Sequence, residues 1–163
     1  MNGVALKYDY ICHIHTKKSS HSTFGDEWRK YLFTCLLGDE DHVKNIIANF
    51  EANEKLGLIF PERISYLKHY PNLWGGNYER LLKLLADIKI SMKIFDYEPI
   101  FPAGNMFWAK AKAIKSIFQR NYNQLDFEEE KSQLDGTLAH AIERSWCYIA
   151  LGNGFTYLKI ASE

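Results

Sequence analysis

Titratable side chains gather at the end of the first apolar stretch of the chain. The segment YDYICHIHTKKSSH, residues 8–21, contains three histidines and two lysines. Side chains two residues apart on a strand point to the same face, so we expect His13 and His15 to face the same way. Two histidines at a strand end can provide half of a zinc site, and a third ligand must then come from elsewhere. His21, His69, His140 or a carboxylate could provide it.

A metal site is the weaker hypothesis for these histidines. None of the potential third ligands lies in a second spaced motif, so the spacing is little evidence for zinc. We therefore expect no stoichiometric zinc, keep a divalent cation as an alternative cofactor, and rank a metal-dependent hydrolase using His13 and His15 last among the functions. For His13 alone, a hydrogen-bonded histidine in the core is the simpler interpretation.

Lys17 and Lys18 follow the histidines at the point where the predicted strand leaves the sheet. Ligands of open α/β sheets bind outside the carboxyl ends of the strands. A pair of lysines is usually solvated. Beside His15 and the hydroxyls of Ser19 and Ser20, however, it could also contact an anion or a sugar, and both interpretations stay open.

The segment FPAGNMFWAKAKAI, residues 101–114, interrupts an aromatic run with Gly104 and Asn105. A glycine within a strand-like pattern indicates a bulge or a close approach of the backbone. Trp108, next to Phe107, could form a wall on which a sugar ring stacks, or it could be a core aromatic. We predict that Gly104, Asn105 and Trp108 bind substrate.

The segment LDGTLAHAIERSW, residues 134–146, opens the last predicted helix with Asp135. An acid at this position either caps the helix or serves as a general base aimed into a cleft. His140 and Arg144 are four residues apart and share a helical face, which Glu143 adjoins. We predict Asp135 as the catalytic base and His140 and Arg144 as substrate ligands, with a plain cap and a solvated stripe as the alternatives.

Apolar patterns predict alternating strands and helices around these segments. Strands are expected over YDYICHIHT, LGLIFP, IFPAGNMFWAK and GFTYLKI. Helices are expected over GDEWRKYLFTCLLGD, residues 41–50, 78–88 and 111–118, and a last stretch from Asp135. The order β-α-α-β-α-β-α-α-β indicates an α/β fold in a single domain over residues 1–163.

The composition narrows the class of protein further. The chain has 163 residues, of which 47% are hydrophobic, so it can bury a sizeable core. Twenty basic and 20 acidic side chains cancel, so bulk charge favours neither nucleic acid nor a membrane surface. The three cysteines are far apart in apolar runs and are expected to be reduced core thiols. No apolar run approaches the roughly 18 residues that a spanning helix needs, so we expect a cytoplasmic protein, either free or peripheral at the inner face of the membrane.

Several of these segments together resemble the rhamnan synthesis protein F family. They are YDYICHIHTKKS, the WR.YL...LLG helix, LGLIFP, FPAGNMFWAKAKAI and DGTLAHAIERSWCYIALGNGF. The likeness runs in order over nearly the whole chain. It implies a role in assembling bacterial cell-surface glycans such as rhamnans, O-antigens or capsules, as a glycosyltransferase or a domain of one.

A looser likeness links the chain to inverting glycosyltransferases of the GT-A fold. Those proteins run a glycine-bearing strand, a helix, a gap and then an acidic motif that opens another helix. The likeness implies a layered, partial GT-A-like fold with a mixed sheet flanked by about five helices, and it puts Asp135 at the position of the base. The metal-binding Asp-x-Asp of those enzymes is replaced here by residues 13–17, HIHTK, so histidine and lysine could neutralise the leaving diphosphate without a metal.

The GT-A likeness also implies a missing part. The nucleotide-binding half of such a domain, on the order of 100 residues, would precede the first strand, so the chain is expected to correspond to the C-terminal half and to bind nucleotide sugars poorly by itself. The edge of the first strand would then need covering by a second copy or a partner chain. Two functions remain: a glycosyltransferase acting on a nucleotide sugar and a glycan acceptor, and a non-catalytic glycan-binding or scaffolding module.

Overall fold

A computed structural model of the chain describes residues 4–16, 25–63, 74–95, 97–129 and 135–161. Its strands are β1 (Tyr10–His13), β2 (Leu56–Pro61), β3 (Phe107–Lys110) and β4 (Thr156–Ile160). Its α-helices are α1 (Gly25–Leu36), α2 (Glu40–Ala52), α3 (Tyr78–Asp87), α4 (Lys115–Phe118) and α5 (Leu138–Gly152). Short 3-10 turns are η1 (Ala5–Lys7), η3 (Gly75–Asn77), η4 (Ala111–Ala113) and η5 (Gln124–Asp126). The predicted order of strands and helices is confirmed.

The four strands form one mixed sheet in the order β1-β3-β2-β4. β3 runs antiparallel to both β1 and β2, whereas β2 and β4 are parallel. The predicted α/β class and mixed sheet are therefore confirmed. Within the described part of the chain β1 forms one edge of this sheet and β4 the other.

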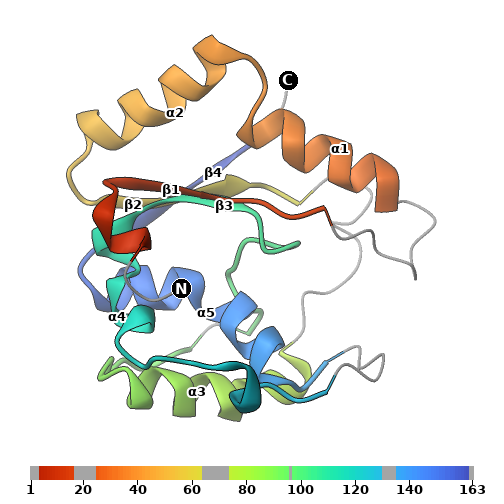
Figure 1. Cartoon of the computed structure of the whole chain (residues 1–163), viewed down its shortest axis with the longest axis vertical. Coiled ribbons are helices and arrows are strands. Elements are labelled where there is room, and N and C mark those ends of the chain that lie inside the picture. Colours follow the sequence, from red (N-terminus) through yellow and green to blue (C-terminus); the bar gives the residue numbers. More distant parts are fainter. Residues whose placement is uncertain (1–3, 17–24, 64–73, 96, 130–134, 162–163) are drawn as a thin grey trace.

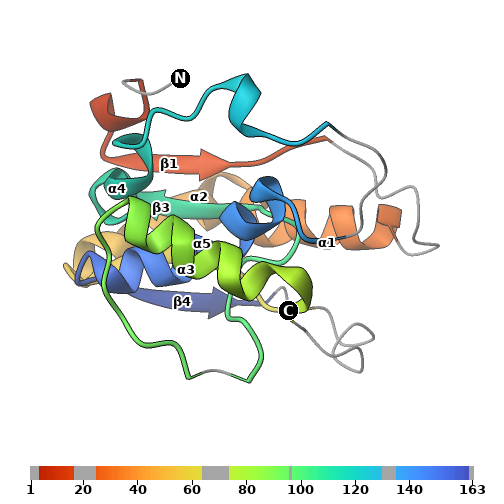
Figure 2. The ribbon, with the colours of Figure 1, turned by 90° about the horizontal axis from the view of Figure 1, so that it is seen from below.

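Helices cover both faces of the sheet. Figure 1 shows α1 and α2 on one side and α3, α4 and α5 on the other, and Figure 2 shows α3 and α5 in front of the strands, roughly along their direction. Every residue of β2 is buried, as expected for a central strand covered on both faces. Its alternate side chains enter different clusters: Leu58 and Phe60 pack on the side of α3 and α5, and Ile59 packs with Ile46 and Phe50 of α2.

Several element boundaries differ from the prediction. The first strand starts at Tyr10 rather than at Tyr8, and the third starts at Phe107 rather than at Ile100. β1 ends at His13 rather than at Thr16, because its partner β3 begins only at Phe107, after a turn, and offers nothing further to pair with. The helix expected over residues 111–118 is divided into η4 and α4. The last helix starts at Leu138 rather than at Asp135, because Gly136 has a φ of +76° and Thr137 is the N-cap that accepts a hydrogen bond from His140 N.

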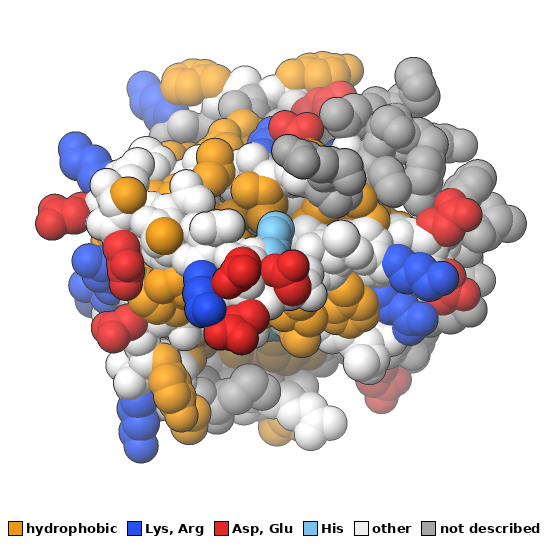
Figure 3. All heavy atoms as spheres, turned by 90° about the horizontal axis from the view of Figure 1, so that it is seen from above, with side chains coloured by type: hydrophobic (Ala, Val, Ile, Leu, Met, Phe, Trp, Pro, Cys, Tyr) orange, Lys and Arg blue, Asp and Glu red, His pale blue; other side chains and the backbone are white. Residues whose placement is uncertain are grey.

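The face of the molecule formed by α1 and α2 carries side chains of both charges. Figure 3 views the molecule from the side of α1 and α2, where acidic, basic and apolar side chains are interspersed. The three cysteines are unpaired, and Cys35 and Cys147 are buried as core thiols. Over the ranges that the structure describes, no helix has the length and apolarity needed to cross a bilayer.

Candidate functional site

The two histidines of the first segment both reach the turn that precedes β3. His13 Nδ1 donates to Asn105 O at 2.6 Å, and His15 Nε2 donates to Gly104 O at 2.7 Å. Because a carbonyl oxygen can only accept, each of these ring nitrogens must carry a hydrogen. The predicted common orientation of the pair is confirmed by these neighbouring contacts, and four of the predicted site residues lie together at this turn.

His13 is the more enclosed of the two. Its ring stacks on Phe107, with centroids 5.2 Å apart and planes inclined by 17°. Burial lowers the pKa of His13, an effect that the hydrogen bond to Asn105 partly opposes and that the charge of His15 adds to. His13 thus fits the interpretation of a hydrogen-bonded core histidine.

His15 lines a cleft of about 510 Å³. The wall of this cleft comes from the chain after β1, from the start of α1, from the turn before β3 and from the start of α5. Its members are His15, Gly25, Trp28, Arg29, Leu32, Gly104, Asn105, Met106, Ala139, His140 and Glu143. Clefts of this volume suit small-molecule ligands. The carboxyl end of β1, the glycine turn and the start of α5 therefore meet at this cleft.

Glu143 brings a carboxylate to the floor of the cleft. Its Oε1 accepts a hydrogen bond from Gly104 N at 3.2 Å. Burial raises the pKa of Glu143, and the charges of Arg144 and His15 and the bond from Gly104 only partly offset this. A buried carboxylate with a raised pKa beside an open cleft is typical of a functional site.

The turn itself is built for close approach. Gly104 has a φ of +85°, in the left-handed region, and a Cβ there would lie 2.8 Å from Leu32 Cδ1 and 3.1 Å from the ring of Trp28. Asn105 follows with a φ of +54°, and its side chain is fixed by Trp146 Nε1, which donates to Asn105 Oδ1 at 2.8 Å. The close backbone approach that Gly104 indicates in the sequence is therefore present, and the position requires glycine.

Asp135 lies in a separate cluster next to this cleft and is not among its lining residues. Its carboxylate accepts hydrogen bonds from Gly76 N at 3.0 Å, from Gly136 N at 2.7 Å and from the side chain of Asn77. Arg144 lies 3.8 Å away. Burial raises the pKa of Asp135, but these bonds and the arginine outweigh it and hold the pKa below its usual value. The role of Asp135 as a base stays a prediction.

Arg144 and His140, both on α5, lie near Asp135 and in the cleft, respectively. The Arg144 guanidinium lies over the ring of Phe101 at 5.1 Å and donates to His140 O at 3.3 Å. Its Nε is buried without a hydrogen-bond partner among the described residues. His140 lines the cleft, with Nδ1 2.7 Å from Thr137 Oγ1.

Trp108 is placed away from the cleft. Neighbouring residues of a strand point to opposite faces, so Phe107 faces α5 and Trp108 faces α1 and α2. The indole Nε1 of Trp108 donates to Leu36 O at 2.8 Å. It packs as a core aromatic, and the aromatic residue that lines the cleft is Trp28.

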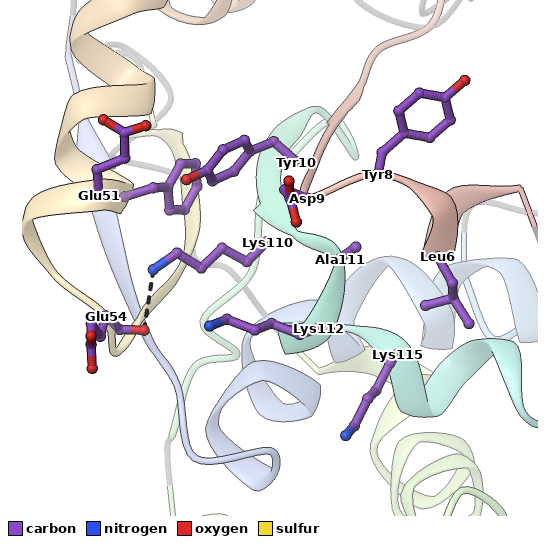
Figure 4. A pocket seen from close by; sticks show the side chains of 11 residues that line it. Leu6, Tyr8, Asp9, Tyr10, Glu51, Glu54, Lys110, Ala111, Lys112 and Lys115 are labelled. Atoms are coloured by element: carbon purple, nitrogen blue, oxygen red, sulfur yellow. Dashed lines mark hydrogen bonds between the residues drawn. The ribbon is translucent and has the colours of Figure 1, made fainter.

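A second hollow, of about 540 Å³, lies at the opposite end of β1 (Figure 4). Tyr8, Tyr10, Glu51 and Lys112 contribute to it. In Figure 4 the ammonium group of Lys110 turns to the backbone, where it donates to the carbonyl oxygens of residues 53 and 54. None of the predicted site residues in the described ranges lines this hollow, whereas His15, Gly104, Asn105 and His140 line the first cleft.

Some predicted residues fall outside the described part of the chain. They are Lys17, Lys18, Ser19, Ser20, His21 and His69. In the described ranges, no group of three or more histidine, cysteine or acidic residues is arranged to hold a metal ion. The predictions about zinc and about phosphate contacts by the lysines therefore stay predictions.

Sequence reasoning missed the contributions of α1 and the main role of Glu143. Trp28 and Arg29 were read only as part of an amphipathic helix, and no local signal distinguishes a cleft wall from a core face. Glu143 was noticed only as a neighbour of the His140–Arg144 face. Its spacing of three residues from His140 was the available signal, because positions three apart on a helix lie side by side.

Comparison with known proteins identifies relatives over nearly the whole chain. The profile of the family described as "Rhamnan synthesis protein F" matches residues 1–155. Two proteins named "Uncharacterized protein WxcX", from strains B100 and ATCC 33913 of Xanthomonas campestris pv. campestris, are each 36% identical over 134 residues. That match covers 82% of this chain but spans only 19% of the length of each relative. No solved structure shows significant similarity. Because the family profile covers almost every residue, the chain belongs to the rhamnan synthesis protein F family, and its role lies in bacterial polysaccharide biosynthesis.

Proposed function

We propose that this chain forms part of a glycosyltransferase that moves a sugar from a nucleotide sugar to a glycan acceptor during synthesis of a rhamnan, O-antigen or capsular polysaccharide. Family membership supports the biosynthetic role. The observation that carries the catalytic part is the cleft at the carboxyl end of β1, where His15, His140 and Glu143 meet beside the indole of Trp28.

The lining of the cleft suits a sugar. An aromatic face packs well on the apolar face of a pyranose, and imidazole, carboxylate and amide groups bind its hydroxyls. The order of parts also supports the GT-A likeness: a glycine turn leads into β3, followed by α4, a gap, Asp135 and then α5. On this basis the cleft receives the acceptor, and the nucleotide is held mainly by parts of the longer protein outside this chain.

The test uses a full-length family protein that contains this region. Purified protein is incubated with a panel of nucleotide sugars and a lipid-linked or oligosaccharide acceptor, and products are followed by mass spectrometry. We expect transfer from at least one donor, and a loss of about 10² or more in kcat/KM for Trp28→Ala or Glu143→Ala. Glu51→Ala, in the second hollow, is the matched control and should leave transfer unchanged.

A full-length protein that binds glycan, yet transfers no sugar from any donor, would favour the non-catalytic binding module. For the 163-residue chain alone, we expect glycan binding that the Trp28→Ala change abolishes and only weak binding of nucleotide sugars.

A further inference from the structure

His15 has one ring nitrogen fixed and the other unused. Nε2 donates to Gly104 O at 2.7 Å, so in the neutral ring Nδ1 carries the lone pair. Nδ1 is buried and has no hydrogen-bond partner among the described residues, although the side chain lines the cleft. A buried ring nitrogen without a partner is costly, and it is expected where a ligand supplies the missing hydrogen.

The carbonyl and the amide of Gly104 are both hydrogen-bonded to side chains that line the cleft. Its carbonyl accepts from His15, and its amide donates to Glu143 Oε1 at 3.2 Å. The left-handed turn thereby fixes the imidazole ring relative to the carboxylate. Glu143 and His15 are also near enough for their charges to interact, so the carboxylate would stabilise a positively charged His15.

We infer that His15 is the proton acceptor of the transfer reaction, that its Nδ1 receives the hydroxyl proton of the glycan acceptor, and that Glu143 is the residue that positions it. The inference rests on the proposed function. As the acceptor oxygen bonds to the anomeric carbon, the bond from that carbon to the diphosphate oxygen breaks. The departing nucleoside diphosphate takes the electron pair, and the acceptor proton moves to Nδ1.

The surroundings of His15 suit this role better than those of Asp135. The ionisable groups that share the cleft or contact its turn are His13 from β1, Arg29 from α1, and His140 and Glu143 from α5. Asp135 instead accepts three hydrogen bonds and lies beside Arg144, which leaves its carboxylate a weak proton acceptor.

The decisive variant is His15→Gln in the full-length protein. The glutamine amide nitrogen can take the place of Nε2 as donor to Gly104 O, but the amide offers no basic nitrogen. We expect kcat to fall by about 10² to 10⁴ with KM for both substrates within a few-fold. His42→Gln is the matched control, because His42 Nε2 donates to Cys35 O at 2.6 Å on a different face of the molecule. It should leave kcat unchanged.

Glu143→Gln gives a second readout that a merely structural role would not move. The glutamine keeps an oxygen for Gly104 N but removes the charge that stabilises protonated His15. We therefore expect kcat to fall while KM for both substrates stays within a few-fold, and this holds as a test even if His15→Gln fails to fold.

The outcomes separate the two proposals. Unchanged kcat in a folded His15→Gln protein would overturn the inference while leaving the proposed function intact, as would loss of turnover in Asp135→Asn without loss in His15→Gln. An unchanged kcat in Glu143→Gln would count against the inference as well. Absence of transfer by the wild-type protein would overturn both.

Discussion

At the scale of single residues, Glu143 carries the clearest conflict between stability and function. Its carboxylate is largely buried, and the described partners are one backbone amide and nearby positive charge. Burying a charged carboxylate is unfavourable unless it is well paired, so Glu143 costs the fold free energy. Such a cost is typical of residues kept for chemistry rather than for packing.

We expect Glu143→Gln to stabilise the protein at neutral pH. Because the folded-state pKa of Glu143 is raised, the folded state binds the proton more tightly, so stability falls as pH rises from the usual carboxyl value through the folded-state pKa. The glutamine variant should lack this loss. Urea denaturation should show a higher free energy of unfolding than wild type at pH 7.5, with the difference shrinking toward pH 4.

Glu51→Gln serves as the control for this prediction, because Glu51 is exposed on α2 and its substitution should change stability little at any pH. A Glu143→Gln protein that is less stable than wild type at pH 7.5 would show that the carboxylate is a structural tie.

The sequence predicted much of the site because local signals coincide there. The hydrogen bonds of His13 and His15 to Asn105 and Gly104 join a strand end to a glycine turn. Both of these features are recognisable from residue spacing. Trp108 could not be placed, since the period of two in a strand says that it opposes Phe107 but not which face of the sheet each occupies. The bond from Gly104 to Glu143 spans 39 positions, and no local pattern encodes such a contact.

At the scale of elements, the order of helices and strands could be predicted from the sequence, whereas the residues at which they begin and end could not. Within the described ranges, apolar patterns located the five α-helices and the four strands, because each must bury at least one face. The start of α5 was misplaced because Asp135, Gly136 and Thr137 form three consecutive plausible helix starts. The hydrogen bond from His140 N to the Thr137 side chain makes Thr137 the N-cap. The Asp135 carboxylate instead accepts a hydrogen bond from Gly76 N in η3.

Asp135 ties η3 to the start of α5, and the tie can be tested apart from catalysis. A Cβ at Gly75 would overlap the Asp135 carboxylate, and Gly75 also has a φ of +54°, so the position requires glycine. We expect Asp135→Ala to cost about 1–3 kcal/mol in unfolding free energy, because the buried side chain of Asn77 loses a partner. Thermal and urea denaturation would measure this.

The dependence of this tie on pH follows from its sign. The pKa of Asp135 is lowered in the folded state, so its contribution is complete above the usual carboxyl value near pH 4 and is lost as pH falls through the lower folded-state value. Asp135→Asn in the full-length protein separates the two roles: lost turnover with an unchanged melting temperature would support the predicted base, and the reverse would support a tie.

At the scale of the whole molecule, the sheet has an edge strand, β1, whose outer side is unpaired within the described ranges. Within the described ranges, the edge strand β1 pairs with β3 alone. Ala111 N donates to Asp9 O at 2.9 Å, and bonded pairs alternate along an antiparallel ladder. The register then puts Ile11 and His13 in the bonded pairs and turns the amides of Tyr10 and Cys12 outward. An edge of this kind is a template for another strand.

In a full-length family protein, we expect a strand from outside this region to pair with this edge, because the match to this chain spans only 19% of the length of each relative. In hydrogen exchange, the amides of Tyr10 and Cys12 should exchange quickly in the 163-residue chain and slowly in the full-length protein, by roughly tenfold for each 1.4 kcal/mol of added protection. Ile11 and His13, already bonded to β3, are the internal control and should change less. Equal exchange in both proteins would rule out this pairing. Slow exchange in the short chain that rises on dilution would instead assign the edge to a second copy, because only self-association depends on concentration.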